Sequence, residues 1–388
     1  MRLLKICTKG MPLFKGNCDI DFVAPQRVNK DNASEMNCIF TANGQSYYQN
    51  NVLSFIGVNA SGKTTILKLL NLLCRMLNNE ALNNISSSEI LDGLSSDKEA
   101  VIDIYFYAKN DTINQLHTVI SRNKGKLLIK DEYLKTKPSS FVKSKKTIFE
   151  FEQIAPEMVR NKDEAFLLDD VSICVAFNKK NNDKITLTDT LQYTNLNELN
   201  VYENCPAELI EFFDPGIEYL KVDVAGKKTD IRLKFKKEEE IILSKTSELN
   251  RYLSSGTIKG INIFISAINS FKTGGYVIID ELENHFNHEI ISTLIGFYKD
   301  KKINPNGAML IFSTHYAELL DEFERNDNIF IVRNLGGITS ENLSFILKRN
   351  DLKKSEVYQS DYLDGTAPNY ESYMKLKKKI ICSQKEDV

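Results

Sequence analysis

A glycine-rich run in the sequence has the residue types that phosphate binding requires. Residues 57–64 match the pattern G-x-x-x-x-G-K-[ST] at every fixed position. Such glycines let backbone N–H groups turn toward one phosphate, the lysine adds a cation, and the threonine hydroxyl binds Mg²⁺. The alternative is a glycine-rich turn without a ligand. We expect ATP to be bound by Gly57, Asn59, Ala60, Ser61, Gly62, Lys63, Thr64 and Thr65, with Thr64 also ligating Mg²⁺.

Two adjacent carboxylates follow an apolar run much later in the chain. Tyr276-Val-Ile-Ile is followed at once by Asp280 and Glu281. Acidic residues at the carboxyl end of a parallel strand lie in the crevice where open α/β sheets bind ligands. We expect Asp280 to support Mg²⁺, directly or through water, and Glu281 to activate the attacking water. Two acids that merely end a strand are the alternative.

A second apolar run, Ala308-Met-Leu-Ile-Phe, ends in Ser313, Thr314 and His315. The same strand-end argument places His315 near the γ-phosphate, where an imidazole could stabilise developing charge. A histidine with a purely structural role at the strand end is the alternative.

A third motif lies at the start of an expected helix. Leu253-Ser-Ser-Gly-Thr precedes an apolar helical pattern, so Ser254, Ser255 and Gly256 would lie at a helix N-terminus, which favours anions. One ATP cannot occupy two sites on opposite edges of a domain. Two subunits arranged head to tail solve this, because each helix then caps the phosphate bound by the other. An ordinary N-cap and turn is the alternative.

The apolar patterns predict the elements that position these residues. Strands are expected over 52–56, 101–107, 276–280 and 308–312, helices over 63–77, 257–271 and 287–299, and a β-hairpin over 1–25. The middle of the chain is less regular. There we expect helices over 150–169 and 195–214 and strands over 171–177 and 231–235.

This order predicts an α/β fold: a P-loop NTPase with an inserted α+β module. We expect an N-terminal lobe of the ATPase head over 1–110 and an insertion over 111–240. A C-terminal lobe over 241–345 and a tail over 346–388 would follow.

The composition excludes several classes of protein. The 388 residues are 42% hydrophobic and 26% charged with a formal net charge of −2, as in an ordinary globular protein rather than a collagen, a disordered chain or a protein that coats nucleic acid. Seven cysteines without a CxxC pair argue against a disulfide framework. The sequence shows no signal peptide and no membrane-length apolar stretch, so we expect a cytoplasmic protein without a membrane partner.

One local stretch is strongly basic. Residues 122–146 contain nine Lys or Arg and two acids, with Tyr133 and Phe141 among them. This mixture suits phosphate contacts and base stacking, so DNA is one candidate partner. A solvated surface hairpin and a protein-docking surface are the alternatives.

Together the motifs resemble those of the ABC-type ATPase heads. Leu253-Ser-Ser-Gly-Thr257 looks like their signature motif, and Asp280-Glu-Leu-Glu-Asn-His-Phe286 looks like their magnesium, base and dimer-loop region. His315 matches their switch histidine. The resemblance covers roughly residues 1–110 and 241–335, and it implies a dimer that closes around ATP and Mg²⁺. The glutamine that links phosphate to the insertion in that family has only Gln115 as a candidate here.

Within that group the sequence looks most like stand-alone bacterial AAA-family ATPases of phage defence: the abortive-infection and PARIS types and relatives of the overcoming-lysogenization-defect (OLD) nucleases. The tail segments 348–354 and 365–370 look similar too. Only about fifty residues follow the His315 region, without the acidic cluster of a Toprim nuclease. The resemblance therefore implies a sensor or scaffold ATPase that controls a separate effector, a nuclease or a toxin. A DNA-maintenance ATPase and, less favoured, a transporter subunit are the alternatives.

Overall fold

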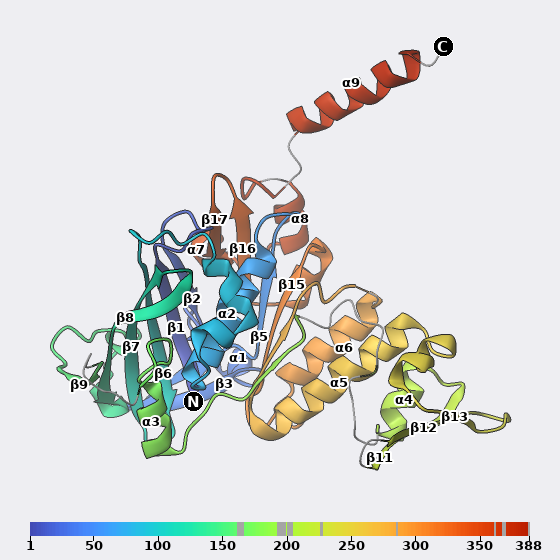
Figure 1. Ribbon diagram of the computed structural model, residues 1–388, viewed down its shortest axis with the longest axis horizontal. Helices are drawn as coiled ribbons and strands as arrows, with labels where there is room; N and C mark the ends of the chain where they lie inside the picture. The colour runs from blue at the N-terminus through green and yellow to red at the C-terminus, as the bar shows by residue number, and fades with distance from the viewer. Residues whose placement is uncertain are drawn as a thin grey trace.

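The computed structural model describes residues 1–160, 167–191, 199, 205–225, 228–284, 286–360, 362–366 and 370–386. Two six-stranded sheets enclose helix α2 (Lys63–Leu77), and two further helices cover the outer face of one of them (Figure 1). The two sheets differ in strand direction, and each contributes differently to the site.

The first sheet is parallel except at one edge, and its order is β10-β14-β15-β5-β16-β17. Its strands are β5 (Val52–Ile56), β10 (Leu187–Asp189), β14 (Tyr276–Ile279), β15 (Met309–Thr314), β16 (Ile329–Asn334) and the antiparallel β17 (Ile338–Asn342). Every residue of β5, β14 and β15 is buried, as expected for parallel strands covered on both faces. Their carboxyl ends therefore meet at one edge of the sheet.

The second sheet is antiparallel, with the order β2-β1-β6-β7-β8-β9. Its strands are β1 (Arg2–Lys9), β2 (Cys18–Asp21), β6 (Ala100–Ala108), β7 (Thr112–Asn123), β8 (Lys126–Pro138) and β9 (Pro156–Val159). Strand β6 alternates buried and half-buried residues along its whole length, because only one face packs on the core. The β1–β2 pair confirms the predicted opening hairpin.

Helix α2 lies between the two sheets (Figure 1) and is buried almost all round. Eleven of its fifteen residues are buried, and the nine apolar ones among them share one core with strands of both sheets. A helix sandwiched in this way needs apolar residues on every side, which its run Ile66-Leu-Lys-Leu-Leu provides. The P-loop that precedes it is thereby fixed to both sheets.

Helices α5 (Ser255–Thr273) and α6 (His288–Lys299) cover the opposite face of the parallel sheet and form the second core with it. Beside α5 lies a small module, visible at the right of Figure 1. It consists of α4 (Ala207–Phe213) and an antiparallel sheet of β11 (Ile217–Ala225), β12 (Lys228–Phe235) and β13 (Ile241–Leu243).

The expected insertion over 111–240 does not coincide with a structural unit. Strand β7 pairs with β6 along its length, so the antiparallel sheet runs across residue 110 without a break. Strand β10 belongs to the parallel sheet. The pattern misled because one face of β7 and β8 lies outside the core, so both strands mix apolar with polar residues, and β8 is rich in charge. Within the described residues, the separate module runs from α4 to β13.

Other elements of this region also differ from expectation. The helix predicted over 150–169 is wrong where the structure describes it, since Pro156–Val159 forms β9. The strand predicted over 171–177 is instead part of helix α3 (Cys174–Asn181). Strand β12 confirms the prediction over 231–235, and α4 falls within 195–214, where residues 195–198 and 200–204 lie outside the described part.

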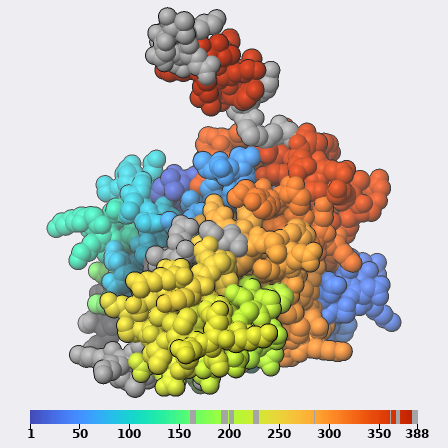
Figure 2. Space-filling model, turned by 90° about the vertical axis from the view of Figure 1, so that its right-hand side faces the viewer, coloured from blue at the N-terminus to red at the C-terminus, as the bar shows by residue number. Residues whose placement is uncertain are grey.

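The remaining elements are short, except for the last. They are α1 (Lys30–Ala33), β3 (Asn37–Ala42), β4 (Gln45–Gln49), α7 (Leu343–Ile346), α8 (Lys354–Gln359) and α9 (Tyr370–Glu386). Helix α9 stands clear of the body in both views (Figures 1 and 2). Among the described helices, none combines the length and the hydropathy that crossing a membrane demands.

Candidate active site

The loop between β5 and α2 has the backbone of a phosphate-binding loop. Ala60 and Gly62 adopt positive φ values of 61° and 99°, which turn successive N–H groups the same way. A Cβ at Gly57 would lie 2.3 Å from Ser61 Oγ and 2.4 Å from the Val332 carbonyl oxygen, so only glycine fits there. The local shape thus requires the glycines that the sequence motif contains.

Lys63 is folded back onto this loop. Its ammonium donates to the carbonyl oxygens of Gly57 (2.8 Å) and Val58 (3.2 Å), and the side chain is buried. Burial lowers the pKa of Lys63, although nearby carboxylates, Glu281 first among them, act in the opposite direction. The two carbonyls hold the cation beside the place where the motif positions a phosphate.

Asp280 faces the start of α2. The Thr64 hydroxyl donates to Asp280 Oδ2 at 2.7 Å, although 216 residues separate the two in sequence. The Ser313 hydroxyl at the end of β15 donates to the other carboxylate oxygen, Oδ1. The structure therefore brings together the two residues predicted to ligate Mg²⁺, and adds Ser313 as a support that the sequence motif did not specify.

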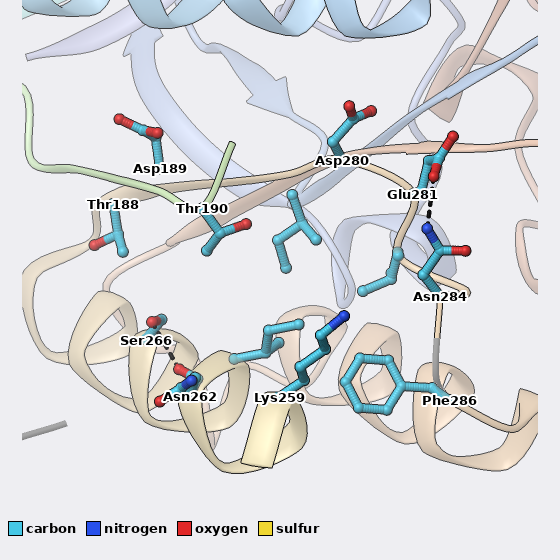
Figure 3. Close-up of a pocket in the computed structure, with 13 residues that line it drawn as sticks. Thr188, Asp189, Thr190, Lys259, Asn262, Ser266, Asp280, Glu281, Asn284 and Phe286 are labelled. Carbon is cyan, nitrogen blue, oxygen red and sulfur yellow. Dashed lines mark hydrogen bonds between the residues drawn. The ribbon is translucent and has the colours of Figure 1, made fainter. Parts of the chain in front are cut away.

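Glu281 sits in an unusual backbone conformation with a φ of 48°. Its N–H donates to Ser313 Oγ at 2.8 Å, and its carboxylate accepts a hydrogen bond from Asn284 Nδ2 at 2.5 Å. A non-glycine residue with positive φ marks strain that the surrounding contacts must stabilise. This turn directs the side chains of Asp280 and Glu281 differently, as Figure 3 shows.

Glu283 holds His315 in position. One oxygen, Oε1, lies 2.7 Å from His315 Nδ1 and accepts the backbone N–H of His315, also at 2.7 Å. The Glu283 side chain is 1% exposed, while that of His315 is 35% exposed. Sequence reasoning assigned no role to Glu283, because its partner lies 32 residues further along the chain. Its spacing from Asp280 was the only available signal.

The Ser254–Gly256 segment lies in a different layer. Ser254 caps α5, accepting the Thr257 N–H at 3.0 Å, and Ser255 and Gly256 form the first turn. Since α5 and α2 cover opposite faces of the parallel sheet (Figure 1), this helix start is not next to the P-loop of the same chain. The capping role weighed as the alternative is real for the hydroxyl of Ser254.

Two other candidates gain no support. Gln115 lies in β7 and donates to Asp103 and the Tyr105 hydroxyl, on the sheet face turned away from the core that contains α2. It is therefore wrong as the phosphate-linked glutamine. His285, part of the dimer-loop resemblance, lies outside the described residues, as do residues 367–369 of the tail.

The basic stretch 122–146 contains the end of β7, all of β8 and the turns that follow, and many of its charged side chains bind other groups of the protein. Arg122 binds Asp92 at 2.7 Å and Lys130 pairs with Glu99. Three further lysines, Lys135, Lys137 and Lys145, donate to backbone carbonyls. This observation weakens the case for a DNA-binding surface here.

The residues present fit ATP and Mg²⁺. Ser61 Oγ is buried without a hydrogen-bond partner within the described residues, as expected for a group that a phosphate would satisfy. No group of three or more His, Cys, Asp or Glu in that part of the chain could hold a metal alone. A magnesium ion at Thr64 and Asp280 would therefore need phosphate oxygens and water as further ligands, which is its usual habit.

A family model described as "AAA domain, putative AbiEii toxin, Type IV TA system" matches residues 207–321. The match supports an AAA-type P-loop ATPase. It covers α4 to β15, and so includes Asp280, Glu281 and His315, while the P-loop lies before it. The family match thus supports a P-loop NTPase, and a domain of that kind implies nucleotide binding. A search among curated proteins found no match.

Proposed function

We propose that this AAA-type ATPase binds and hydrolyses ATP, with Mg²⁺, at the edge where β5, β14 and β15 end. The observation that carries the proposal is the hydrogen bond between Thr64 and Asp280, which joins the P-loop to the acidic strand end. Strand β15 lies between the other two, so His315 comes from between the P-loop and the carboxylates. Three motifs distant in sequence, the P-loop, Asp280–Glu281 and His315, thus converge on one place.

Each residue has a role that follows from its position. Bound ATP with Mg²⁺ would supply the phosphoanhydride bond that water breaks. Lys63 would exchange its two carbonyl partners for phosphate oxygens, and Thr64 and Asp280 would hold the metal. Glu281 would accept a proton from the attacking water, and His315, oriented by Glu283, would stabilise charge on the phosphate.

We further propose that two copies close around two ATP molecules. The start of α5 is a helix N-terminus on the opposite layer from its own P-loop, so a second copy is the natural source of the phosphate it would face. Ser255 and Gly256 would then act across the dimer. Homo-oligomer formation would depend on ATP, and hydrolysis would reopen it.

The biological role we propose is that of a sensor or scaffold in an abortive-infection type of defence, controlling a separate effector. The description of the matching family, which mentions AbiEii toxin, supports this direction. Two apolar surfaces could receive such a partner. One is the exposed stripe of Tyr373, Leu376 and Ile380 on α9, and the other is the groove between α4 and α5 that Phe212 and Phe264 line.

Glu281→Gln tests the catalytic proposal. The variant should retain ATP and lose about 10²–10⁴ in turnover, because the general base is removed while the shape is kept. Lys63→Ala serves as the control that loses ATP binding as well. Unchanged turnover of Glu281→Gln would refute the role of Glu281.

The mass of tagged Glu281→Gln purified from its native host with ATP and Mg²⁺ tests the assembly. A dimer or larger complex with a stoichiometric second protein supports the defence role. A dimer that carries only DNA would favour the maintenance role instead. If Glu281→Gln stays a monomer whether or not ATP is present, the shared site is refuted. If the shared site is right, adding Ser255→Arg should leave the protein monomeric although it still binds ATP.

A further inference from the structure

A cavity of about 200 Å³ lies beside the carboxylates, between α5 and the ends of β10 and β14 (Figure 3). It is lined by Lys259 and Asn262 of α5, Thr188 beside β14, and Glu281 and Asn284 after β14. None of residues 57–65, all of which the structure describes, lines it. The cavity is therefore separate from the P-loop, yet it shares the wall formed by Asp280 and Glu281.

Lys259 is the notable group in this wall. Its side chain is only 7% exposed, and Figure 3 shows its ammonium directed into the cavity. Within the described residues it has neither a hydrogen-bond acceptor nor a paired carboxylate, and burial alone lowers the pKa of Lys259. A largely buried lysine without a partner is costly, so an anion bound in the cavity would stabilise Lys259.

The neighbouring carboxylates do not supply that anion. Both oxygens of Asp280 are engaged, one by Thr64 and the other by Ser313. Glu281 accepts from Asn284 at the rim. Asp189, at the far end of the cavity, is paired with Arg75 at 2.6 Å. Each of these carboxylates is hydrogen-bonded or ion-paired to a group other than Lys259, whose charge is left for a ligand.

The size of the cavity limits what that ligand is. A volume of about 200 Å³ has room for a small hydrated oxyanion. The polar residues Thr188 and Asn262 line the same space, together with apolar residues such as Ile263 and Phe286, so Lys259 is the cation among the lining residues. An inorganic phosphate ion matches this size and charge.

We propose that this cavity binds the inorganic phosphate that hydrolysis releases, with Lys259 as its cation. The proposal rests on the proposed ATPase function, because Asp280 and Glu281 form the wall between the two places. Phosphate leaving the magnesium site on the side away from the P-loop would meet Lys259 next. The cavity would therefore govern how fast product leaves, without a part in cleavage.

A calorimetric titration with inorganic phosphate at constant ionic strength tests the site without any hydrolysis. The full chain carrying Lys63→Ala, which weakens the P-loop, should still bind phosphate. Adding Lys259→Met should weaken that binding at least about tenfold, since a charge-assisted hydrogen bond is lost. Lys272→Met, an exposed lysine of the same helix, is the matched control and should change nothing. Equal binding with and without Lys259 would overturn the proposal.

Kinetics on the unmutated P-loop provide the second readout. Lys259→Met should cleave ATP in a single turnover within about twofold of the parent, while the phosphate concentration for half-inhibition rises about tenfold. Lys259→Arg should restore the parent's phosphate concentration for half-inhibition. That result would also show that the effect of Lys259→Met is not caused by misfolding. Slower cleavage would make Lys259 part of the chemical step and overturn the proposal.

Two further results are kept apart by this design. A parent protein without turnover would refute the proposed function, whereas the calorimetric titration would still decide on the cavity. Loss of ATP-dependent dimerisation in Lys259→Met, with phosphate binding unchanged, would show that an acidic side chain of the second copy is the anion and would overturn the phosphate site.

Discussion

Removal of the Glu283 carboxylate should lower the turnover number, because His315 loses its orientation, without changing the affinity for ATP. Glu283 Oε1 makes two contacts of 2.7 Å with His315, one to the ring and one to the backbone. A hydrogen bond to a charged group contributes about 1.5–3 kcal/mol net. If that orientation is needed in the transition state, Glu283→Ala should lower the turnover number about 10- to 150-fold. The affinity for ATP should stay within about twofold, because Glu283 does not touch the P-loop.

Glu283→Gln refines this expectation. The amide keeps an acceptor oxygen of the same reach but loses the charge, and neutral bonds are roughly half as strong. We therefore expect a fall of about three- to tenfold. The other oxygen, Oε2, is buried without a partner within the described residues, so the neutral variant should melt at the same temperature as the parent or higher.

A steady-state ATPase assay, an ATP titration and thermal denaturation measure the three quantities. The decisive control is a double-mutant cycle with His315→Ala. When Glu283 acts through His315, Glu283→Ala causes no further loss in the His315→Ala background. Additive losses, or parental turnover in Glu283→Ala, would refute the reasoning. A joint collapse of ATP binding and stability would instead make Glu283 a residue of the fold.

Three further predictions follow from single positions. Gly62→Ala should destabilise the protein by about 1–3 kcal/mol and abolish ATP binding. The reason is that Gly62 has a φ of 99° and that a Cβ there would lie 2.5 Å from Ile338 Cδ1. Urea denaturation measures the loss of stability, and an ATP titration measures the loss of binding. The hydrogen bond with Asp103 raises the pKa of His117 in the folded protein. The stability difference between the parent and His117→Gln should therefore be largest below the pKa of the unfolded state, about 6.5. It should vanish as the pH rises through the pKa of the folded state. Burial lowers the pKa of Lys137 from 10.5 to about 8, so the parent should gain stability between these pH values, and Lys137→Met should lack that gain in the same denaturation assay.

The sequence predicts the parts of the fold where an apolar run marks a strand and where the adjoining loop requires particular residue types. The strand before Gly57 is wholly apolar, and the loop that follows cannot form without its glycines. The strand expected over 276–280 ends at Ile279, one residue earlier, and the one over 308–312 occupies 309–314. Buried parallel strands are short continuous apolar runs, which stand out in a sequence of mixed character.

The parts that the sequence does not predict depend on contacts distant in the chain. Strands β7 and β8 mix apolar with polar residues because one face lies outside the core, and nothing local indicates that they extend the sheet of β1 and β6. The run around Cys174 is apolar enough for a buried strand, yet it packs as a short helix. Similarly, the contact of Glu283 with His315 and the place of Lys259 in the cavity beside Glu281 depend on residues distant in the sequence.

The position of Lys259 on α5 suggests how two active sites would communicate. Ser255 and Lys259 are four residues apart, so about one helical turn of 6 Å separates the proposed cross-dimer contact from the proposed phosphate cavity. Coupling between sites requires that a ligand contact the two states of an element differently. Inorganic phosphate would pair with Lys259 only after ATP is cleaved. The γ-phosphate of the ATP bound by the second copy would contact Ser255 only before cleavage. One rigid helix would then register both events, and phosphate departure, rather than cleavage, would set the time at which the two copies separate.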